Sequence, residues 1–123
     1  MAQVEACTAS VIAANTAEEQ KVLTAMELLL KLTSNITKNP TESKYRTIRS
    51  TIPKIARELF GVAGGVTDLV LALGFMQVDE EHFVFVGDYF KVLKRGQFLI
   101  EKAIEPIKVK FMTPAERIKW DQL

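Results

Sequence analysis

Residues that build catalytic and metal sites are scarce in this sequence. Its 123 residues include one cysteine, Cys7, and one histidine, His82. A single cysteine cannot form a disulfide within the chain, which is typical of proteins from a reducing compartment. A single histidine leaves no cluster of metal ligands and no evident base beside a nucleophile. The sequence therefore predicts no catalytic residue, no metal site and no cofactor, and a small enzyme is the weakest functional hypothesis.

Long hydrophobic runs and an excess of one charge are also absent. The longest apolar run, LVLALGFM at 69–76, is too short to cross a bilayer. Residues 1–15 lack the basic start and the longer apolar stretch of a signal peptide. The formal net charge is +1, so the molecule as a whole is not a polycation that coats nucleic acid. We therefore predict a cytoplasmic protein, with the nucleus as the alternative location, and no membrane span.

Helical periodicity is the main structural signal that the sequence does contain. Apolar residues from Val22 to Ile36 recur at helical spacing, which predicts an amphipathic helix that ends at Lys38. Thr16 and Glu19 have the spacing of a capping box, so we place the start of this helix at Thr16. Further helices are expected to begin at Asn39, Pro53, Thr67, Asp88 and Thr113, and Pro106 is expected to end the one that begins at Asp88.

Two short runs rich in valine and phenylalanine predict an antiparallel hairpin. Residues 75–78 and 82–86 flank a polar turn, and residues 45–50 are the candidate for a third strand. The expected fold is α+β, mostly helical with a small two- or three-stranded antiparallel sheet. We divide the chain into a loose N-terminal tail or frayed helix at 1–15, one domain at 16–105, and a C-terminal extension with a short helix at 106–123.

Basic residues are concentrated in one stretch of this nearly neutral chain. Residues 38–57 carry six bases against one acid, a local charge of +5 in a chain whose total is +1. The bases surround Tyr45 and lie where a helix is expected to pass into an extended segment. The six bases are Lys38, Lys44, Arg46, Arg49, Lys54 and Arg57.

Three interpretations of this basic stretch remain open from the residues alone. Most charge runs are simply the solvated face of a helix. Bases grouped around an aromatic ring also suit a groove that binds an acidic peptide through an aromatic or aliphatic anchor. The other binding hypothesis is a nucleic-acid-binding domain that uses residues 38–57, although no known nucleic-acid motif is visible in the sequence.

The same stretch contains a motif with specific spacing. NITKNPTESKYRTIR at 35–49 places Asn-Pro ahead of a Lys-Tyr pair and an Ile-Arg pair, and LVLALGF at 69–75 ends in Gly-Phe. In this order the residues resemble the PUB domain, also called PUG, over about residues 16–105. The family occurs in peptide:N-glycanase, in UBX-domain cofactors and in a linear-ubiquitin ligase. The sequence departs from the family pattern at 50–53, where STIP includes one extra residue.

The resemblance implies a binding module rather than a catalyst. PUB domains bind the acidic C-terminal tail of valosin-containing protein, a hexameric AAA ATPase, and link factors of the ubiquitin-proteasome pathway and of ER-associated degradation to it. Carried over by the motif, the tail contacts would be Asn35, Tyr45 and Arg49. Lys44 and Lys38 are added because an acidic ligand would meet them by electrostatic attraction. If the parent protein is a glycanase, its catalytic residues lie outside this chain.

Overall fold

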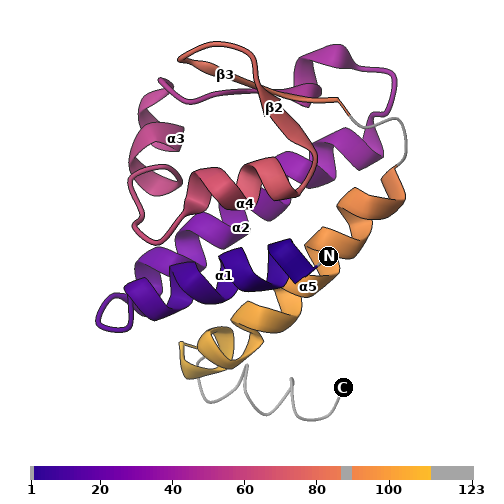
Figure 1. Ribbon diagram of the computed structural model, residues 1–123. Helices are drawn as coiled ribbons and strands as arrows, with labels where there is room; N and C mark the ends of the chain where they lie inside the picture. Colours follow the sequence, from indigo (N-terminus) through magenta and orange to yellow (C-terminus); the bar gives the residue numbers. More distant parts are fainter. Residues whose placement is uncertain (1, 87–89, 112–123) are drawn as a thin grey trace.

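Helices dominate the structure, and one small sheet lies against them (Figure 1). The structure is a computed structural model that describes residues 2–86 and 90–111. The predicted α+β class, mostly helical with a small antiparallel sheet, is confirmed. In chain order, the elements are the helices α1 (Ala2–Ala14) and α2 (Glu19–Lys38), the 3-10 helix η1 (Ser43–Arg46), the strand β1 (Thr47–Arg49), the helices α3 (Pro53–Glu58) and α4 (Val66–Ala72), the strands β2 (Phe75–Gln77) and β3 (His82–Phe85), and the helix α5 (Phe90–Lys110).

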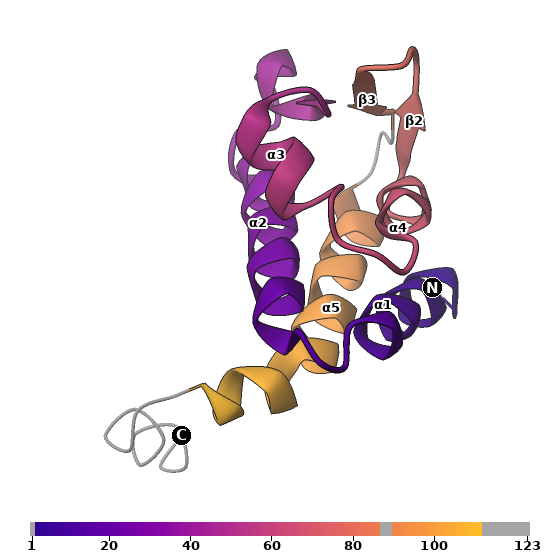
Figure 2. The same ribbon diagram turned by 90° about the vertical axis from the view of Figure 1, so that its left-hand side faces the viewer.

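The two long helices, α2 and α5, pack against each other and form the centre of the molecule (Figures 1 and 2). Each is amphipathic, so one face of each helix is removed from water. Within this contact, Gln97 Nε2 of α5 donates a hydrogen bond of 2.9 Å to Thr33 Oγ1 of α2. The buried apolar residues of the pair include Val22, Met26, Leu29 and Ile36 on α2, and Leu93, Ile100, Ile104 and Ile107 on α5.

The sheet has three antiparallel strands in the order β1-β3-β2, so the predicted hairpin and third strand are confirmed. Side chains alternate between its two faces. Ile48, Phe75, Phe83 and Phe85 are buried on the face that joins the core. Residues on the other face, including Arg49 and Met76, are exposed. The sheet therefore places the residues that follow η1 at an accessible edge of the molecule.

The N-terminal segment is a packed helix, so the prediction of a loose tail or a frayed helix at 1–15 was wrong. Val4 and Val11 of α1 are fully buried, and α1 contacts both α4 and α5. Asn15, which follows the helix, donates Nδ2 hydrogen bonds to the carbonyl oxygens of Val11 (2.7 Å) and Ala63 (2.9 Å). Two of the four residues on the buried stripe at 4, 8, 11 and 15 are polar, so the apolar signal in the sequence was too weak to indicate a helix.

Two predicted helix starts were also wrong. The helix α2 begins at Glu19, because a turn in which Glu18 N donates to Asn15 O (2.9 Å) precedes it and no Thr16 capping box forms. Asn39 does not begin a helix. Its backbone N and its Nδ2 both donate to Asn35 O at 3.1 Å, which closes the end of α2, and η1 begins only at Ser43.

The helix α5 continues through Pro106, where we expected it to end. Proline removes one backbone donor from a helix. Pro106 is exposed, so water can satisfy the carbonyl that this donor would have met, while Ile104 and Ile107 on either side are buried. Burial of these two side chains keeps the helix intact to Lys110. The predicted starts at Asp88 and Thr113 lie outside the described residues.

Candidate peptide-binding site

The five residues that the sequence singled out lie at the end of α2, on η1 and on β1, three consecutive elements that define the candidate region. Contacts between α2 and η1, and between η1 and β1, hold this region together. The turn at Asn39 brings the chain back across the end of α2, as Figure 1 shows. The five residues are Asn35 and Lys38 on α2, Lys44 and Tyr45 on η1, and Arg49 on β1.

Tyr45 and Lys44 form the middle of the region. Tyr45 is half-buried, and its apolar part packs against the hydrophobic core. Lys44 is exposed, and its Nζ lies 5.2 Å from the centroid of the Tyr45 ring. Such a cation–π contact at an exposed site contributes about 0.5–1 kcal/mol. The ring is therefore fixed from one side by the core and remains partly accessible from the other.

Arg49 is the accessible guanidinium at the edge of the sheet. Its Nε donates a hydrogen bond of 3.1 Å to Thr51 Oγ1, and its Nη2 lies 3.6 Å from Glu81 Oε2. The Arg49 and Glu81 side chains are 57% and 46% exposed, so water screens this ion pair and it is weak. A carboxylate of a ligand could therefore replace Glu81 at little cost.

The turn that carries Glu81 is tied to β1 and is ordered internally. Ser50 N donates to Glu81 O at 2.7 Å. Asp79 Oδ1 accepts hydrogen bonds from the backbone N–H groups of Glu81 (2.8 Å) and His82 (2.9 Å). The His82 ring nitrogen Nδ1 lies 2.8 Å from the same oxygen. The His82 side chain, followed by the Glu81 N–H, lowers the pKa of the Asp79 carboxyl from its ordinary value of 3.8. These bonds fix the backbone position of Glu81 beside Arg49.

Arg46 has a structural role that the sequence analysis did not distinguish from that of its basic neighbours. Its guanidinium lies over two aromatic rings, 5.8 Å from the centroid of Phe85 and 5.4 Å from that of Phe90. Its Nη2 also donates a hydrogen bond of 3.2 Å to Pro40 O. These contacts join the segment before η1 to β3 and α5. Nothing in the local sequence separates Arg46 from Arg49, because the two rings are about 40 residues away in the chain.

Lys54 and Arg57 do not join this region, although the sequence placed them in the same basic stretch. Both lie on α3, where Lys54 Nζ is 4.0 Å from Glu58 Oε2. Lys38 and Asn35 remain at the end of α2, Lys38 exposed and Asn35 half-buried. The structure therefore separates Lys54 and Arg57, which line hollows between α2 and α3, from the four bases on α2, η1 and β1.

Groups suited to covalent or metal chemistry are scarce in the part of the chain that the structure describes. Residues 2–86 and 90–111 contain no cluster of three or more His, Cys, Asp or Glu side chains that could hold a metal ion. They also contain no helix that is both long and apolar enough to cross a membrane. Burial, followed by the nearby Asp68 carboxylate, raises the pKa of the Cys7 thiol above its ordinary value of 9.0, which disfavours the nucleophilic thiolate.

Comparison with known proteins shows the family of the chain. The family model of the PUB domain matches residues 19–99. A peptide-N(4)-(N-acetyl-beta-glucosaminyl)asparagine amidase from Gallus gallus is 43% identical over 63 residues, which cover 51% of this chain and 9% of that protein. The relative is named as an enzyme, but the PUB domain is a non-catalytic module. The chain therefore belongs to the PUB domain family, whose members are protein-interaction domains.

Proposed function

We propose that this chain binds the acidic C-terminal tail of the AAA ATPase valosin-containing protein, and thereby attaches a protein-quality-control factor to it. The observation that carries the proposal is the arrangement of Tyr45 and Arg49. A half-buried ring is fixed against the core, and the Arg49 guanidinium, four residues later in the chain, forms a weak, solvent-screened ion pair with Glu81. Such a pair provides an apolar anchor point and a replaceable ion pair, the two features needed to bind a tail that has both acids and a Leu-Tyr pair.

Each residue then has a distinct role toward the tail. A tail carboxylate replaces Glu81 at Arg49 and forms charge-assisted hydrogen bonds, which contribute about 1.5–3 kcal/mol when they are well formed. The Tyr45 ring packs against an apolar side chain of the tail and can donate a hydrogen bond through its hydroxyl. The Asn35 amide pairs with the tail backbone. Lys44 and Lys38, both exposed, attract the acidic segment before contact and chiefly raise the association rate.

The wider biological role follows from the same proposal. The chain covers 9% of the Gallus gallus relative. We propose that it is the non-catalytic binding domain of a larger protein of the ubiquitin-proteasome pathway, such as a peptide:N-glycanase that acts in ER-associated degradation. The catalytic residues of that protein would lie outside this chain, and the protein would act in the cytoplasm or the nucleus.

A calorimetric titration with a synthetic acidic peptide that ends in the Leu-Tyr segment tests this function, with duplex DNA as the competing ligand. We expect saturable 1:1 binding of the peptide that the DNA does not displace. A phosphate on the peptide tyrosine should weaken binding although it adds negative charge, because the tyrosine has to enter a partly apolar site and the phosphate would lose its hydration.

The opposite results would contradict the proposal. Tighter binding of the phosphorylated peptide would indicate an open basic surface without an apolar anchor. Displacement of the peptide by DNA would favour the nucleic-acid alternative that uses residues 38–57. That alternative has fewer bases available than the sequence suggested, because Arg46 lies over the rings of Phe85 and Phe90.

A further inference from the structure

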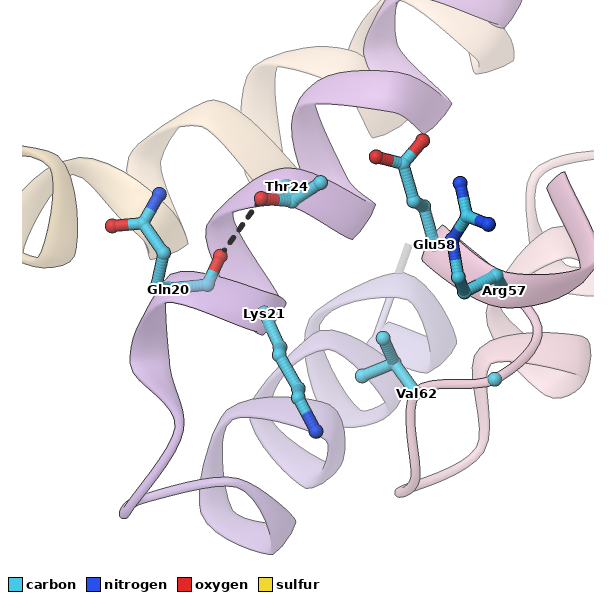
Figure 3. Close-up of a pocket in the computed structure, with 7 residues that line it drawn as sticks. Gln20, Lys21, Thr24, Arg57, Glu58 and Val62 are labelled. Carbon is cyan, nitrogen blue, oxygen red and sulfur yellow. Dashed lines mark hydrogen bonds between the residues drawn. The ribbon is translucent and has the colours of Figure 1, made fainter. Parts of the chain in front are cut away.

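A groove between α2 and α3 lies apart from the residues of the proposed tail site. Figure 3 shows its larger hollow, where Gln20, Lys21 and Thr24 of α2 face Arg57 and Glu58 of α3. This hollow has a volume of about 570 Å³. An adjoining hollow of about 210 Å³ shares Thr24 and Glu58 with it and extends the groove along both helices. The remaining lining residues are Gly61 and Val62 in the larger hollow and Glu27, Leu28, Lys31 and Lys54 in the smaller one.

The charges of the α2–α3 groove favour an acidic ligand. Its lining carries four bases and two acids. Lys21 pairs with Glu18 outside the lining at 3.1 Å, and Lys54 lies 4.0 Å from Glu58. Among residues 2–86 and 90–111, neither Lys31 nor Arg57 has a partner in an ion pair. Two cations in the groove are therefore available to carboxylates from outside.

The groove also offers a hydrogen-bond acceptor, which distinguishes a peptide from a bare polyanion. The oxygen Oε2 of Glu58 is buried and accepts no hydrogen bond from the described residues. The Glu58 side chain as a whole is 28% exposed, so its carboxylate can be reached from the groove. A peptide backbone supplies N–H donors together with acidic side chains, whereas a phosphate backbone would bring a second acceptor against the Glu58 carboxylate. The groove is therefore complementary to an acidic peptide.

The groove is continuous with the proposed tail site along one stripe of α2. Gln20, Thr24, Leu28, Lys31 and Asn35 follow one another at intervals of three or four residues, which places them on the same side of a helix. Thr24 and Asn35 are separated by about 17 Å along the helix axis at 1.5 Å per residue. An extended peptide covers that distance with about five residues. Figure 2 shows α3 alongside α2, which confines this path on one side.

We propose that the α2–α3 groove is a second binding subsite for the same acidic peptide. It takes the segment about five residues N-terminal to the part that Asn35, Tyr45 and Arg49 hold, because a tail bound by its C-terminal end can continue only in that direction. Carboxylates of this segment pair with Lys31 and Arg57, and one backbone N–H donates to the Glu58 carboxylate. The inference rests on the proposed function, and it extends the recognised ligand from a terminal anchor to a longer acidic stretch.

The experiment compares three synthetic peptides by calorimetric titration. The first is the short acidic Leu-Tyr tail, and the other two carry an eight-residue N-terminal extension, either rich in Asp and Glu or made of Ser and Gly. We expect the acidic extension to bind about threefold to tenfold tighter than the neutral one, the range for two exposed ion pairs. The double variant Lys31→Gln and Arg57→Gln should lose this gain and bind the short peptide as before.

Two further variants distinguish binding in the groove from general attraction of the acidic peptide to exposed bases. Thr24→Trp fills the groove without changing charge, and it should also abolish the gain from the acidic extension. Lys91→Gln with Lys94→Gln removes two exposed lysines of α5 that do not line the groove, and it should preserve the gain. Circular dichroism and the affinity for the short peptide check that each variant is folded.

The possible failures are distinguishable. If the short peptide does not bind the unmodified protein, the proposed function itself is wrong. If the short peptide binds but the acidic extension adds nothing, the second subsite does not exist. A gain that survives Thr24→Trp, or that falls equally in the α5 control, would show diffuse attraction and would overturn the proposal of a built groove.

Discussion

Truncation of Val11 to alanine tests whether α1 is an integral part of the folded domain. The Val11 side chain is fully buried, and α1 contacts α4 and α5. The loop before α4 approaches this point closely, since a Cβ added at Gly64 would lie 2.7 Å from Val11 Cα. The truncation therefore removes two methyl groups from a position where the backbone on both sides is fixed.

The expected loss of stability is the sum of two contributions, the lost burial of the methyl groups and the cavity that they leave. Two buried methyl groups contribute about 1.6 kcal/mol at roughly 0.8 kcal/mol each. A cavity that cannot collapse adds about 1 kcal/mol at roughly 24 cal/mol per Å³. We therefore expect Val11→Ala to lower the free energy of unfolding by about 2–3 kcal/mol, which corresponds to a fall in melting temperature of roughly 10 °C.

Urea denaturation followed by circular dichroism at the helical band measures this change. The midpoint should fall while the slope with urea concentration stays constant, since the surface exposed on unfolding is nearly the same. Val92→Ala on α5 is the matched control, because the Val92 side chain is 51% exposed. It should change stability by less than about 0.5 kcal/mol. Equal, small effects of both substitutions would refute the reasoning and would mean that α1 unfolds independently.

Three further predictions concern the site and its turn. Tyr45→Ala should weaken tail binding by more than about 1 kcal/mol, as is usual for an interface anchor. Calorimetry with the short peptide measures this loss of affinity. Unchanged affinity together with a large loss of stability would mean that Tyr45 is a core residue only. Arg49→Ala should reduce the binding free energy by up to about 3 kcal/mol and raise the dissociation rate. Arg49→Lys should restore only part of this loss, because lysine lacks the planar guanidinium that binds a carboxylate through two hydrogen bonds. Equal affinity of the unmodified protein and both variants in surface plasmon resonance would exclude a direct ion pair. The lowered pKa of Asp79 means that its contribution to stability is complete above the ordinary carboxyl value of 3.8 and is lost as the pH falls through the folded value. Asp79→Asn should therefore flatten the acid limb of the stability profile below about pH 4 in urea titrations, and an identical limb in both proteins would exclude this role.

Local patterns in the sequence were sufficient where one segment's own chemistry decides its structure. The amphipathic spacing from Val22 to Ile36 predicted α2 and its end at Lys38. Short runs rich in β-branched and aromatic residues predicted the hairpin and a third strand at 45–50, which forms at Thr47–Arg49. The motif at 35–49 indicated the PUB family, which the family match at 19–99 confirms. The helix and the strands follow from short-range geometry, because helical and extended chains repeat with fixed and different periods, whereas the family rests on the resemblance of the motif.

The composition of the site was predicted only in part, because charge in a sequence carries no direction. Arg46 and Arg49 are three residues apart and look alike in the sequence. Arg46 lies over Phe85 and Phe90, whereas Arg49 is exposed beside Glu81. Whether a guanidinium is available to a ligand depends on which distant residues fold next to it. The same reason separates Arg57 from the tail site and places it in the α2–α3 groove.

Only the tertiary structure decided the elements whose own signal is weak. The helix α1 has little apolar periodicity, and α5 contains Pro106 and Gly96, which are poor residues for a helix interior. Gly96 is buried where the helices meet, and a Cβ there would lie 2.4 Å from Leu73 Cδ2. A larger residue at 96 would force the Leu73 side chain to move, so glycine suits the packing of α5 against Leu73 although it is locally unfavourable. The sequence determined the regular elements and the family, and long-range burial determined which weak segments became helices and which bases remained free to bind.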